Sequence, residues 1–271
     1  MEKNSKELLV IMPAYNEEGS IGQFLEQLEE NHVTDIADIL VINDGSSDDT
    51  SHIVNAYGHE IITHIYNMGY TAALLSGYKF AVRRRYKYVI QIDSDGQHDV
   101  CNIFTLYDML KDSEGRPDGP DIIIGSRFLE GGKSFPISRL KRLTINFFRW
   151  LTRVTTGETV SDPTSGLQGL NSRALLYYAT YSHFDDKYPD TNMIIQMMLL
   201  GYKISEIPAV MHPREAGTSM HSGLIKQGIY MAHMFFSICA VLIRTLVLKV
   251  ETRSGPDKRA GKVYYEISKR D

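Results

Sequence analysis

The chain has 271 residues, of which 43% are hydrophobic and 23% charged, and its formal net charge is −4. This length and composition fit one large globular domain, or one domain with a C-terminal extension. A nucleic-acid-binding protein is not indicated, because such proteins usually present a basic face. The two cysteines, Cys101 and Cys239, have neither a metal-ligand spacing nor a disulfide framework, so we expect a cytoplasmic protein.

The first half of the chain alternates short apolar runs with helical patterns. Five runs bounded by polar turns predict strands at residues 8–12, 39–42, 61–65, 88–92 and 122–124. Their near-continuous hydrophobicity is typical of strands that are covered on both faces. The first intervening segment has the apolar spacing of a helix, at Ile21, Phe24, Leu25 and Leu28. This βαβα order predicts an α/β fold with a mostly parallel central sheet flanked by helices.

The second half of the chain is more helical. Helices are predicted at residues 137–156, 172–180 and 191–200, and a strand near 202–207. We expect a main domain over residues 1–220, a C-terminal amphipathic or apolar helix over 221–250, and a polar tail over 251–271.

Polar clusters follow three of the predicted strands, at residues 13–17, 43–46 and 93–97. In open α/β sheets the ligand crevice lies at the carboxyl ends of the strands. One cluster alone is weak support, because every strand must end in a polar turn. Three clusters at one edge of one sheet favour a binding site. Neither a G-x-G-x-x-G nor a G-x-x-x-x-G-K-[ST] motif is present, so a dehydrogenase or a P-loop NTPase is not indicated.

Asp93 and Asp95 form the sharpest of these signals. In an extended chain, residues two apart point to the same side, so both carboxylates would face one spot. Mg²⁺ and Mn²⁺ prefer such oxygen ligands and often bridge substrate phosphates, and Gln97 could add a neutral oxygen. The alternative is a helix-capping aspartate beside a second one in a turn. A calcium loop is excluded, because Phe104 stands where its glutamate should be.

An ordered series of motifs resembles the family-2 glycosyltransferases, and within them the dolichyl- and polyprenyl-phosphate sugar synthases. The series comprises Pro-Ala-Tyr-Asn-Glu at 13–17, Asn-Asp-Gly-Ser-Ser-Asp at 43–48, Asn-Met-Gly-Tyr at 67–70, Asp-Ser-Asp-Gly-Gln-His at 93–98, Gly-Ser-Arg at 125–127, Asp-Pro-Thr-Ser-Gly at 162–166 and Arg-Glu-Ala-Gly-Thr-Ser at 214–219. The resemblance implies a GT-A type nucleotide-binding fold. It also implies a metal-dependent transferase that inverts the anomeric centre.

The resemblance also implies roles for individual residues. Those expected to bind the nucleotide-sugar are Pro13, Tyr15, Glu17, Asp44, Ser46 and Asp93. Those expected to bind Mg²⁺ or Mn²⁺ are Asp93, Asp95 and Gln97. Those expected to bind acceptor or leaving-group phosphate are Arg127, Arg142, Arg214 and Ser219. An arginine fork suits phosphate oxygens. Residues expected to be catalytic are Asp95, Arg127 and Asp190.

Two positions depart from the family pattern. Asn43 stands where many relatives carry a second acid, which leaves the nucleotide preference open. Asp190 is the only acid where many members place an acidic pair. It could be a general base, an acceptor contact or the N-cap of the following helix. His98 is expected to have a hydrogen-bonding role rather than to bind the metal.

The C-terminal segment leaves three alternatives open. Residues 227–243 carry no formal charge, which is at the lower edge for a membrane-spanning helix. An in-plane helix at a membrane surface, flanked by Lys226, Arg244, Lys249 and Arg253, fits a lipid-linked acceptor better. The third alternative is a buried helix or one that forms a homo-oligomer. On the second alternative, the protein would be peripheral at the inner face of the membrane.

The expected reaction moves a hexosyl group from a nucleoside-diphosphate sugar to polyprenyl phosphate. A phosphate acceptor is already ionised near neutral pH, so it needs no strong general base, whereas a sugar hydroxyl does. The alternative is a glycan-elongating transferase in cell-surface polysaccharide synthesis, with Asp190 as its base.

Overall fold

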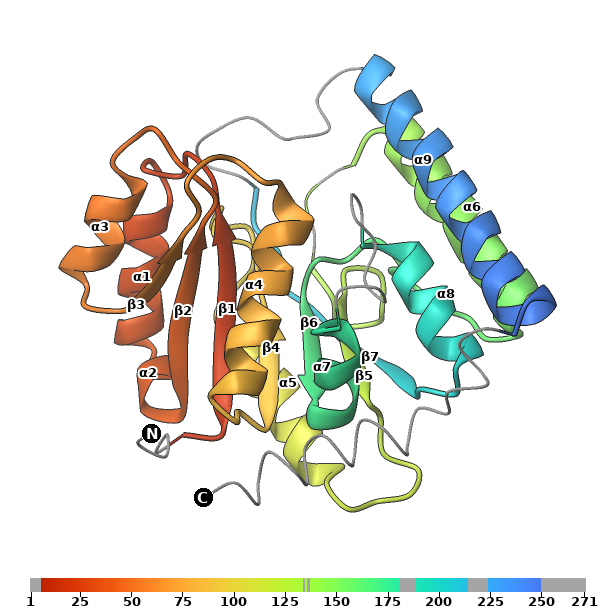
Figure 1. Ribbon diagram of the computed structural model, residues 1–271, viewed down its shortest axis with the longest axis horizontal. Coiled ribbons are helices and arrows are strands. Elements are labelled where there is room, and N and C mark those ends of the chain that lie inside the picture. Colours follow the sequence, from red (N-terminus) through yellow and green to blue (C-terminus); the bar gives the residue numbers. More distant parts are fainter. Residues whose placement is uncertain (1–5, 134, 136, 181–188, 214–223, 250–271) are drawn as a thin grey trace.

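Figure 1 shows the computed structural model, which describes residues 6–133, 135, 137–180, 189–213 and 224–249. Its centre is a seven-stranded sheet with the order β3-β2-β1-β4-β6-β5-β7. The strands are β1 (Leu8–Ala14), β2 (Ala37–Asn43), β3 (Glu60–Thr63), β4 (Tyr88–Gln91), β5 (Ile122–Ser126), β6 (Gln168–Asn171) and β7 (Ile204–Pro208). Only β6 runs antiparallel to its neighbours, β4 and β5. The mostly parallel sheet predicted from the sequence is therefore confirmed.

Helices cover both faces of the sheet. They are α1 (Ile21–Glu30), α2 (Val33–Ile36), α3 (Thr50–Ala56), α4 (Tyr70–Arg83), α5 (Cys101–Asp112), α6 (Arg139–Thr156), α7 (Ser172–Tyr178), α8 (Thr191–Leu199) and α9 (Leu224–Leu242), which continues into the π-helix η2 (Ile243–Val247). Alternate residues of β1 point to opposite faces, as a strand requires. Leu8 and Val10 pack with α1 and α5, whereas Leu9 and Ile11 pack with α4, α7 and α8.

The five strands predicted in the first half are confirmed, with small shifts at their ends. The third strand covers residues 60–63 instead of 61–65, and β7 confirms the strand expected near 202–207. Strand β6 was not predicted. Its sequence, Gln-Gly-Leu-Asn, has no apolar run, and it is recruited into the sheet by pairing with β4 and β5.

Helices α6, α8 and α9 form a separate apolar layer beside the sheet (Figure 1). Phe148 of α6, Ile195 of α8 and Met234 of α9 are fully buried there. By length and composition, one stretch of the described residues could span a membrane: Gly228–Val247, with a mean hydropathy of 1.7. The inner side of α9 is nevertheless part of the packed fold.

Candidate active site

The candidate site lies where the order of the sheet reverses. Strand β1 pairs with β2 on one side and with β4 on the other, so the loops after these three strands meet at one edge. Ligands of open α/β sheets bind in the crevice at such a switch point. We call residues 13–18, 43–50 and 93–97 the strand-end loops.

The first two strand-end loops are joined by hydrogen bonds between their side chains and backbones. The amide of Asn16 donates to Ser46 Oγ at 3.0 Å, and the amide of Ser47 donates to Asn16 Oδ1 at 2.9 Å. Asn43 Oδ1 accepts from the amide of Ser46 at 3.0 Å. Tyr15, beside this junction, is 48% exposed. An exposed ring on a held loop is available to stack on a flat ligand.

Asp44 is buried and hydrogen-bonded within the protein, whereas a contact with the nucleoside was predicted for it. It is 3% exposed, and its carboxylate accepts hydrogen bonds from the amides of Met68 and Gly69 at 2.8 and 2.7 Å. His64 Nδ1 lies 2.7 Å from the same carboxylate. Gly45 follows with a φ of +68°, and a Cβ there would lie 2.5 Å from the backbone of Tyr66. Asp44 therefore holds the 64–69 loop against the end of β2.

Pro13 and Glu17 line the end of β1. Pro13 is buried in the strand, and its carbonyl accepts a hydrogen bond from Ser94 Oγ at 2.8 Å, which links β1 to the loop after β4. Glu17 accepts from Ser20 Oγ at 2.7 Å, and its amide donates to Thr50 Oγ1 at 2.9 Å. Both residues lie at the predicted edge.

Asp93 follows the end of β4, and Asp95 stands in a turn. Strand β4 ends at Gln91, and residues 94 and 95 form a turn. Strand alternation therefore does not extend to Asp95, and the cation shared by the two carboxylates stays a prediction. Asp95 accepts a hydrogen bond from the amide of Gln97 at 3.0 Å and is 9% exposed, whereas the side chain of Asp93 is 36% exposed.

The surroundings of Asp93 fit a hard divalent cation. Tyr70 Oη donates to Asp93 Oδ1 at 3.1 Å, and burial, with Asp93 itself, raises the pKa of Tyr70, so that the phenol stays protonated. A Cβ on Gly166 would lie 3.0 Å from Asp93 Oδ2, so a larger residue there would press on this carboxylate. Burial lowers the pKa of His98, 4.0 Å from Asp93 Oδ2, to about 4, so the ring is neutral at pH 7.

Across the described residues, no group of three or more His, Cys, Asp or Glu side chains could hold a metal ion. Mg²⁺ and Mn²⁺ do not require such a cage, because one or two carboxylates suffice when substrate phosphates and water supply the other ligands. Asp93, Asp95 and Gln97 offer oxygen donors of this kind.

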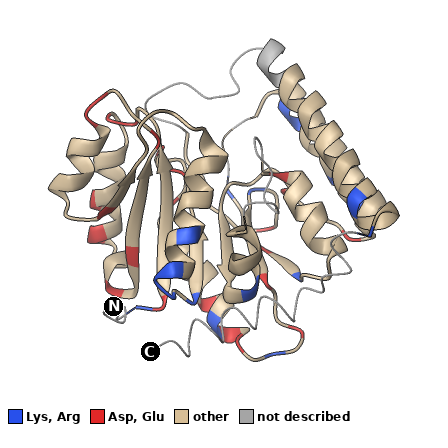
Figure 2. Cartoon of the chain, viewed as in Figure 1, with Lys and Arg blue, Asp and Glu red and all other residues tan. Residues whose placement is uncertain are grey.

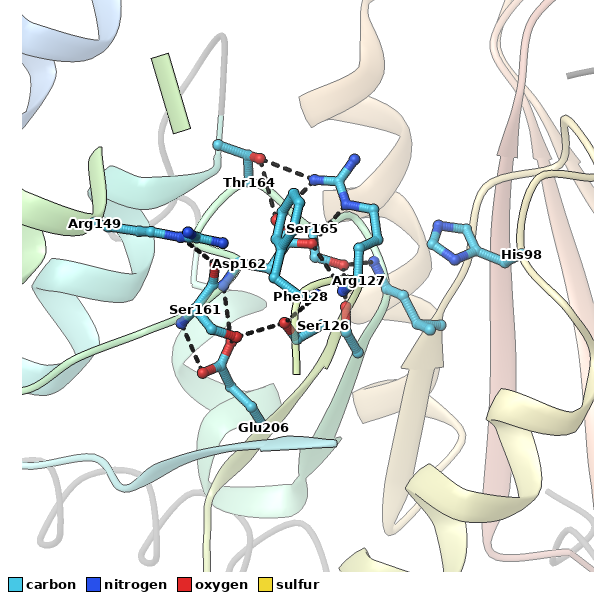
Figure 3. Close-up of polar contacts among 12 residues, drawn as sticks. His98, Ser126, Arg127, Phe128, Arg149, Ser161, Asp162, Thr164, Ser165 and Glu206 are labelled. Carbon is cyan, nitrogen blue, oxygen red and sulfur yellow. Dashed lines mark hydrogen bonds and ion pairs between the residues drawn. The ribbon is translucent and has the colours of Figure 1, made fainter. Parts of the chain in front are cut away.

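Arg127 follows β5 and is clamped by a buried carboxylate. Its Nε and Nη2 donate to the two oxygens of Asp162 at 2.6 and 2.7 Å, and Nη2 also donates to Thr164 at 3.1 Å (Figure 3). Burial opposes the charge on Arg127, but Asp162, Asp190 and Asp93 outweigh it and raise the pKa of Arg127. Within the described chain, no hydrogen bond from Nη1 is seen, so this nitrogen can serve a ligand.

Asp190 stands at the N-cap position of α8, but its side chain makes no capping hydrogen bond. Its Oδ2 instead accepts from Tyr230 Oη of α9 at 2.8 Å. Burial raises the pKa of Asp190 to about 6; Asp93 adds to this, while Tyr230 and Arg127 oppose it. The carboxylate of Asp190 is therefore not the cap of α8. Its pKa responds instead to the charges of Asp93 and Arg127.

The remaining predicted phosphate contacts are less well placed. Arg142 lies exposed on the first turn of α6. Desolvation and the charge of Arg127 lower the pKa of Lys141, the neighbour of Arg142. Arg214 and Ser219 lie outside the described residues.

Several residues at the site were not assigned from the sequence. Asp162 belongs to a motif that was noted, but its partner Arg127 is 35 residues away. Glu206 of β7 and Tyr230 of α9 lie in segments without any motif. We call Arg127, Asp162, Asp190 and Glu206 the charged cluster.

Comparisons with known proteins agree with this geometry. Residues 9–176 match the family described as Glycosyl transferase family 2. The polyprenol monophosphomannose synthase of Mycolicibacterium smegmatis is 28% identical over 226 residues, covering 79% of this chain and 81% of that protein. The undecaprenyl-phosphate mannosyltransferase of Micrococcus luteus is 25% identical over 228 residues, covering 80% and 88%.

A solved structure shares the fold. The glucosyl-3-phosphoglycerate synthase from Mycobacterium tuberculosis, in complex with Mn²⁺, uridine diphosphate and phosphoglyceric acid, aligns with a TM-score of 0.63 at 16% identity. The alignment covers 88% of this chain and 78% of that one.

Proposed function

Since the chain belongs to glycosyltransferase family 2, we propose that it transfers a hexosyl group from a nucleoside-diphosphate sugar to polyprenyl phosphate, with inversion at the anomeric carbon. The observation that carries this proposal is the arginine clamped after β5: Asp162 holds the guanidinium of Arg127 by two hydrogen bonds, and Gly166, four residues further on, lies against the carboxylate of Asp93. Carboxylates for a cation and an arginine for phosphate then face one crevice.

On the donor side, the strand-end loops bind the nucleotide-sugar. Tyr15, Glu17 and Ser46 lie along the ends of β1 and β2, where the nucleoside would rest. Asp93, Asp95 and Gln97 would hold Mg²⁺ or Mn²⁺. When bound, the cation neutralises the negative charge that grows on the departing diphosphate. The Mn²⁺ and uridine diphosphate of the solved relative are consistent with this assignment.

On the acceptor side, the phosphate oxygen attacks the anomeric carbon as the bond to the diphosphate breaks. Two anions must approach each other, so a fixed cation between them lowers the barrier. Arg127 supplies that cation, and Asp162 holds its guanidinium in one orientation. Desolvation and the charge of Arg127 lower the pKa of Lys141, at the start of α6, which would add positive charge on this side of the site. Arg142, exposed on the same turn, stays a predicted phosphate contact. The names of the two relatives, which specify polyprenol and undecaprenyl phosphate, support this acceptor class.

A second candidate is transfer to a saccharide hydroxyl. Its support is the pKa of Asp190, which burial raises to about 6. A carboxylate of that pKa is largely ionised at neutral pH and is a stronger base than an ordinary aspartate. The two candidates share the donor and differ only in the acceptor.

The outer surface of α6 and α9 supports a lipid-linked acceptor. Large apolar side chains are exposed along both helices: Leu143, Trp150, Val154, Ile229, Phe236 and Ile243. Residues 228–243 carry no charged side chain, and α9 is almost uncharged in Figure 2. An apolar face flanked by basic residues suits the surface of an anionic bilayer. The protein would then bind the inner face of the membrane through α6 and α9.

One assay tests the acceptor. Radiolabelled nucleoside-diphosphate hexoses are offered with polyprenyl phosphate, with an oligosaccharide, or with neither, in the presence of Mg²⁺ or Mn²⁺. We expect a radiolabelled lipid product only in the first reaction. Labelled oligosaccharide without labelled lipid would favour the second candidate.

A matched pair of variants tests the membrane face. Phe236 is 70% exposed and Ile238 is 1% exposed, two residues apart on α9. Phe236→Ser should reduce flotation with anionic liposomes and leave the melting temperature unchanged. Ile238→Ser should lower the melting temperature instead. Unchanged flotation of a Phe236→Ser, Trp150→Ser double variant would refute the membrane face.

A further inference from the structure

The 161–166 loop contacts three parts of the candidate site. Asp162 clamps Arg127, and Gly166 lies against the carboxylate of Asp93. The carbonyl of Pro163 accepts a hydrogen bond from Thr191 Oγ1 at 2.9 Å, directly after Asp190. The position of this loop therefore bears on the cation site, on the arginine and on the start of α8.

Glu206 holds the beginning of this loop. Its Oε2 accepts from the amide of Ser161 at 2.7 Å, and its Oε1 accepts from the amide of Asp162 and from Ser161 Oγ, each at 2.9 Å (Figure 3). Two consecutive backbone amides thus point at one carboxylate. Hydrogen bonds to an ionised group are stronger than those between neutral groups.

The sheet places Glu206 where it can do this. It lies on β7, an edge strand, and its register partner on β5 is Ile124. Strand β5 ends two residues later at Ser126, whose hydroxyl hydrogen-bonds with that of Ser161. Ser161 Oγ therefore contacts both the carboxylate of Glu206 and Ser126, the last residue of β5. Arg127 is the next residue of the chain after Ser126.

We propose that Glu206 is a positioning residue for the acceptor side: it fixes the backbone of Ser161 and Asp162, and thereby the carboxylate that orients Arg127. The inference rests on the proposed function, in which Arg127 meets the acceptor phosphate. Glu206 itself touches no substrate. An arginine held in this way has little conformational freedom left to lose when the phosphate binds.

Glu206→Gln tests the proposal, because it keeps the shape of the side chain but turns an acceptor oxygen into a donor that faces a backbone amide. We expect the KM for polyprenyl phosphate to rise about tenfold, which corresponds to losing roughly one charge-assisted hydrogen bond. The KM for the donor should stay within twofold. The matched control is Glu60→Gln, an exposed glutamate on β3 at the opposite edge of the sheet, which should leave both values unchanged.

The direction of the change separates positioning from simple charge. If Glu206 acted only by repelling the acceptor phosphate, Glu206→Gln would lower the acceptor KM, and the proposal would be overturned. Combination with Arg127→Lys gives a second test, since lysine cannot make the forked contact with Asp162. If Glu206 acts by positioning Arg127, Glu206→Gln should cause no further rise in the acceptor KM of the Arg127→Lys variant. Additive effects would contradict it.

Two further measurements keep the test decisive. Should Glu206→Gln fold poorly, Thr164→Val removes the bond from Arg127 Nη2 to Thr164 and the bond from Thr164 Oγ1 to Asp162 Oδ1, and should raise the acceptor KM in the same direction. A wild-type chain inactive toward polyprenyl phosphate would refute the proposed function. The Glu206 inference is then decided by melting temperatures, because positioning predicts that the effects of Glu206→Gln and Arg127→Lys do not add.

Discussion

The strand-end loops and the charged cluster are held together by different interactions. The loops at the ends of β1 and β2 are joined by exposed hydrogen bonds from backbone amides, which end on a hydroxyl, as between Asn16 and Ser46, or on a carboxylate, as between Asp49 and Glu18. The cluster depends on buried charges: Arg127 forms an ion pair with Asp162, and the charge of Asp190 also raises the pKa of Arg127. Breaking an exposed hydrogen bond costs little, because water replaces the partner, whereas a buried charge left without its partner is costly. Substitutions in the loops should therefore mostly affect binding, and those in the cluster both folding and catalysis.

The largest effect is expected for Asp95→Asn in the strand-end loops. The amide keeps an oxygen that can accept from Gln97, so the turn should survive, but the charge for the cation is gone. We expect kcat/KM to fall roughly a hundredfold to a thousandfold, as loss of electrostatic stabilisation by a metal implies. Steady-state kinetics over a Mn²⁺ titration measures this.

Asp112→Asn, at the exposed end of α5, is the matched control and should behave like the wild type. Full wild-type activity in EDTA would remove the cation from the proposed mechanism.

Arg127→Ala should break the charged cluster in both respects. It leaves Asp162, which is 0% exposed, without its counter-charge, at a cost of roughly 3–5 kcal/mol in unfolding free energy. It also removes the cation facing the acceptor: at an effective dielectric constant of about 20, unit charges 4 Å apart interact by roughly 4 kcal/mol, so turnover should fall about a hundredfold or more. Donor affinity should change only a few-fold.

The double variant Arg127→Met, Asp162→Asn separates the two effects. It removes both charges, so stability should recover while acceptor turnover stays low. If turnover recovers as well, Arg127 has a structural role only.

Asp44→Ala tests the comparison between the strand-end loops and the charged cluster. Asp44 lies in the loops, but it is buried like Arg127 and Asp162. The substitution leaves the amides of Met68 and Gly69 without an acceptor, so we expect a loss of roughly 2 kcal/mol or more in unfolding free energy. Donor affinity should fall with it. A variant with an unchanged melting temperature and no donor affinity, measured by calorimetry, would instead support the direct nucleoside contact predicted from the sequence.

The smallest effect concerns the pH dependence that Asp190 causes. Burial raises its pKa from 3.8 to about 6, so the folded protein binds more protons than the unfolded chain between these values. Stability from this group therefore falls as the pH rises through that window. Asp190→Asn abolishes the effect, and its melting temperature relative to the wild type should increase between about pH 4 and pH 7.

Kinetics of the same variant address the acceptor. Asp190→Asn should cost little turnover with polyprenyl phosphate and most of it with a hydroxyl acceptor. A nearly inactive Asp190→Asn beside an active Arg127→Ala, both measured with the acceptor that the wild type uses, would favour glycan elongation.

The strand-end loops could be predicted from the sequence because their parts are local. Each follows an apolar run, and the carboxyl-end rule brings together motifs such as those at Tyr15 and Asp93. The turn at Asp95 could not be predicted, because an apolar run predicts a strand but not the conformation that follows it; β4 ends at Gln91 and residues 94 and 95 form the turn.

The charged cluster was predicted only in part. Arg127 and Asp190 were named, but the partners that decide their behaviour come from distant segments: Asp162, Glu206 and Tyr230. The pairing of Arg127 with Asp162 depends on β6, a strand with no apolar run, which carries the 161–166 loop to the end of β5. Tertiary pairing, not local preference, forms this strand.

Strand β6 also constrains the order in which the chain can fold. It sits between β4 and β5, although it follows both in sequence. During synthesis, β1 to β4 can pair with one another as they emerge, but β5 cannot join them until β6 has been made. Until then the outer edge of β4 has no neighbour and can pair with another chain. The late arrival of four residues thus makes productive folding compete with aggregation.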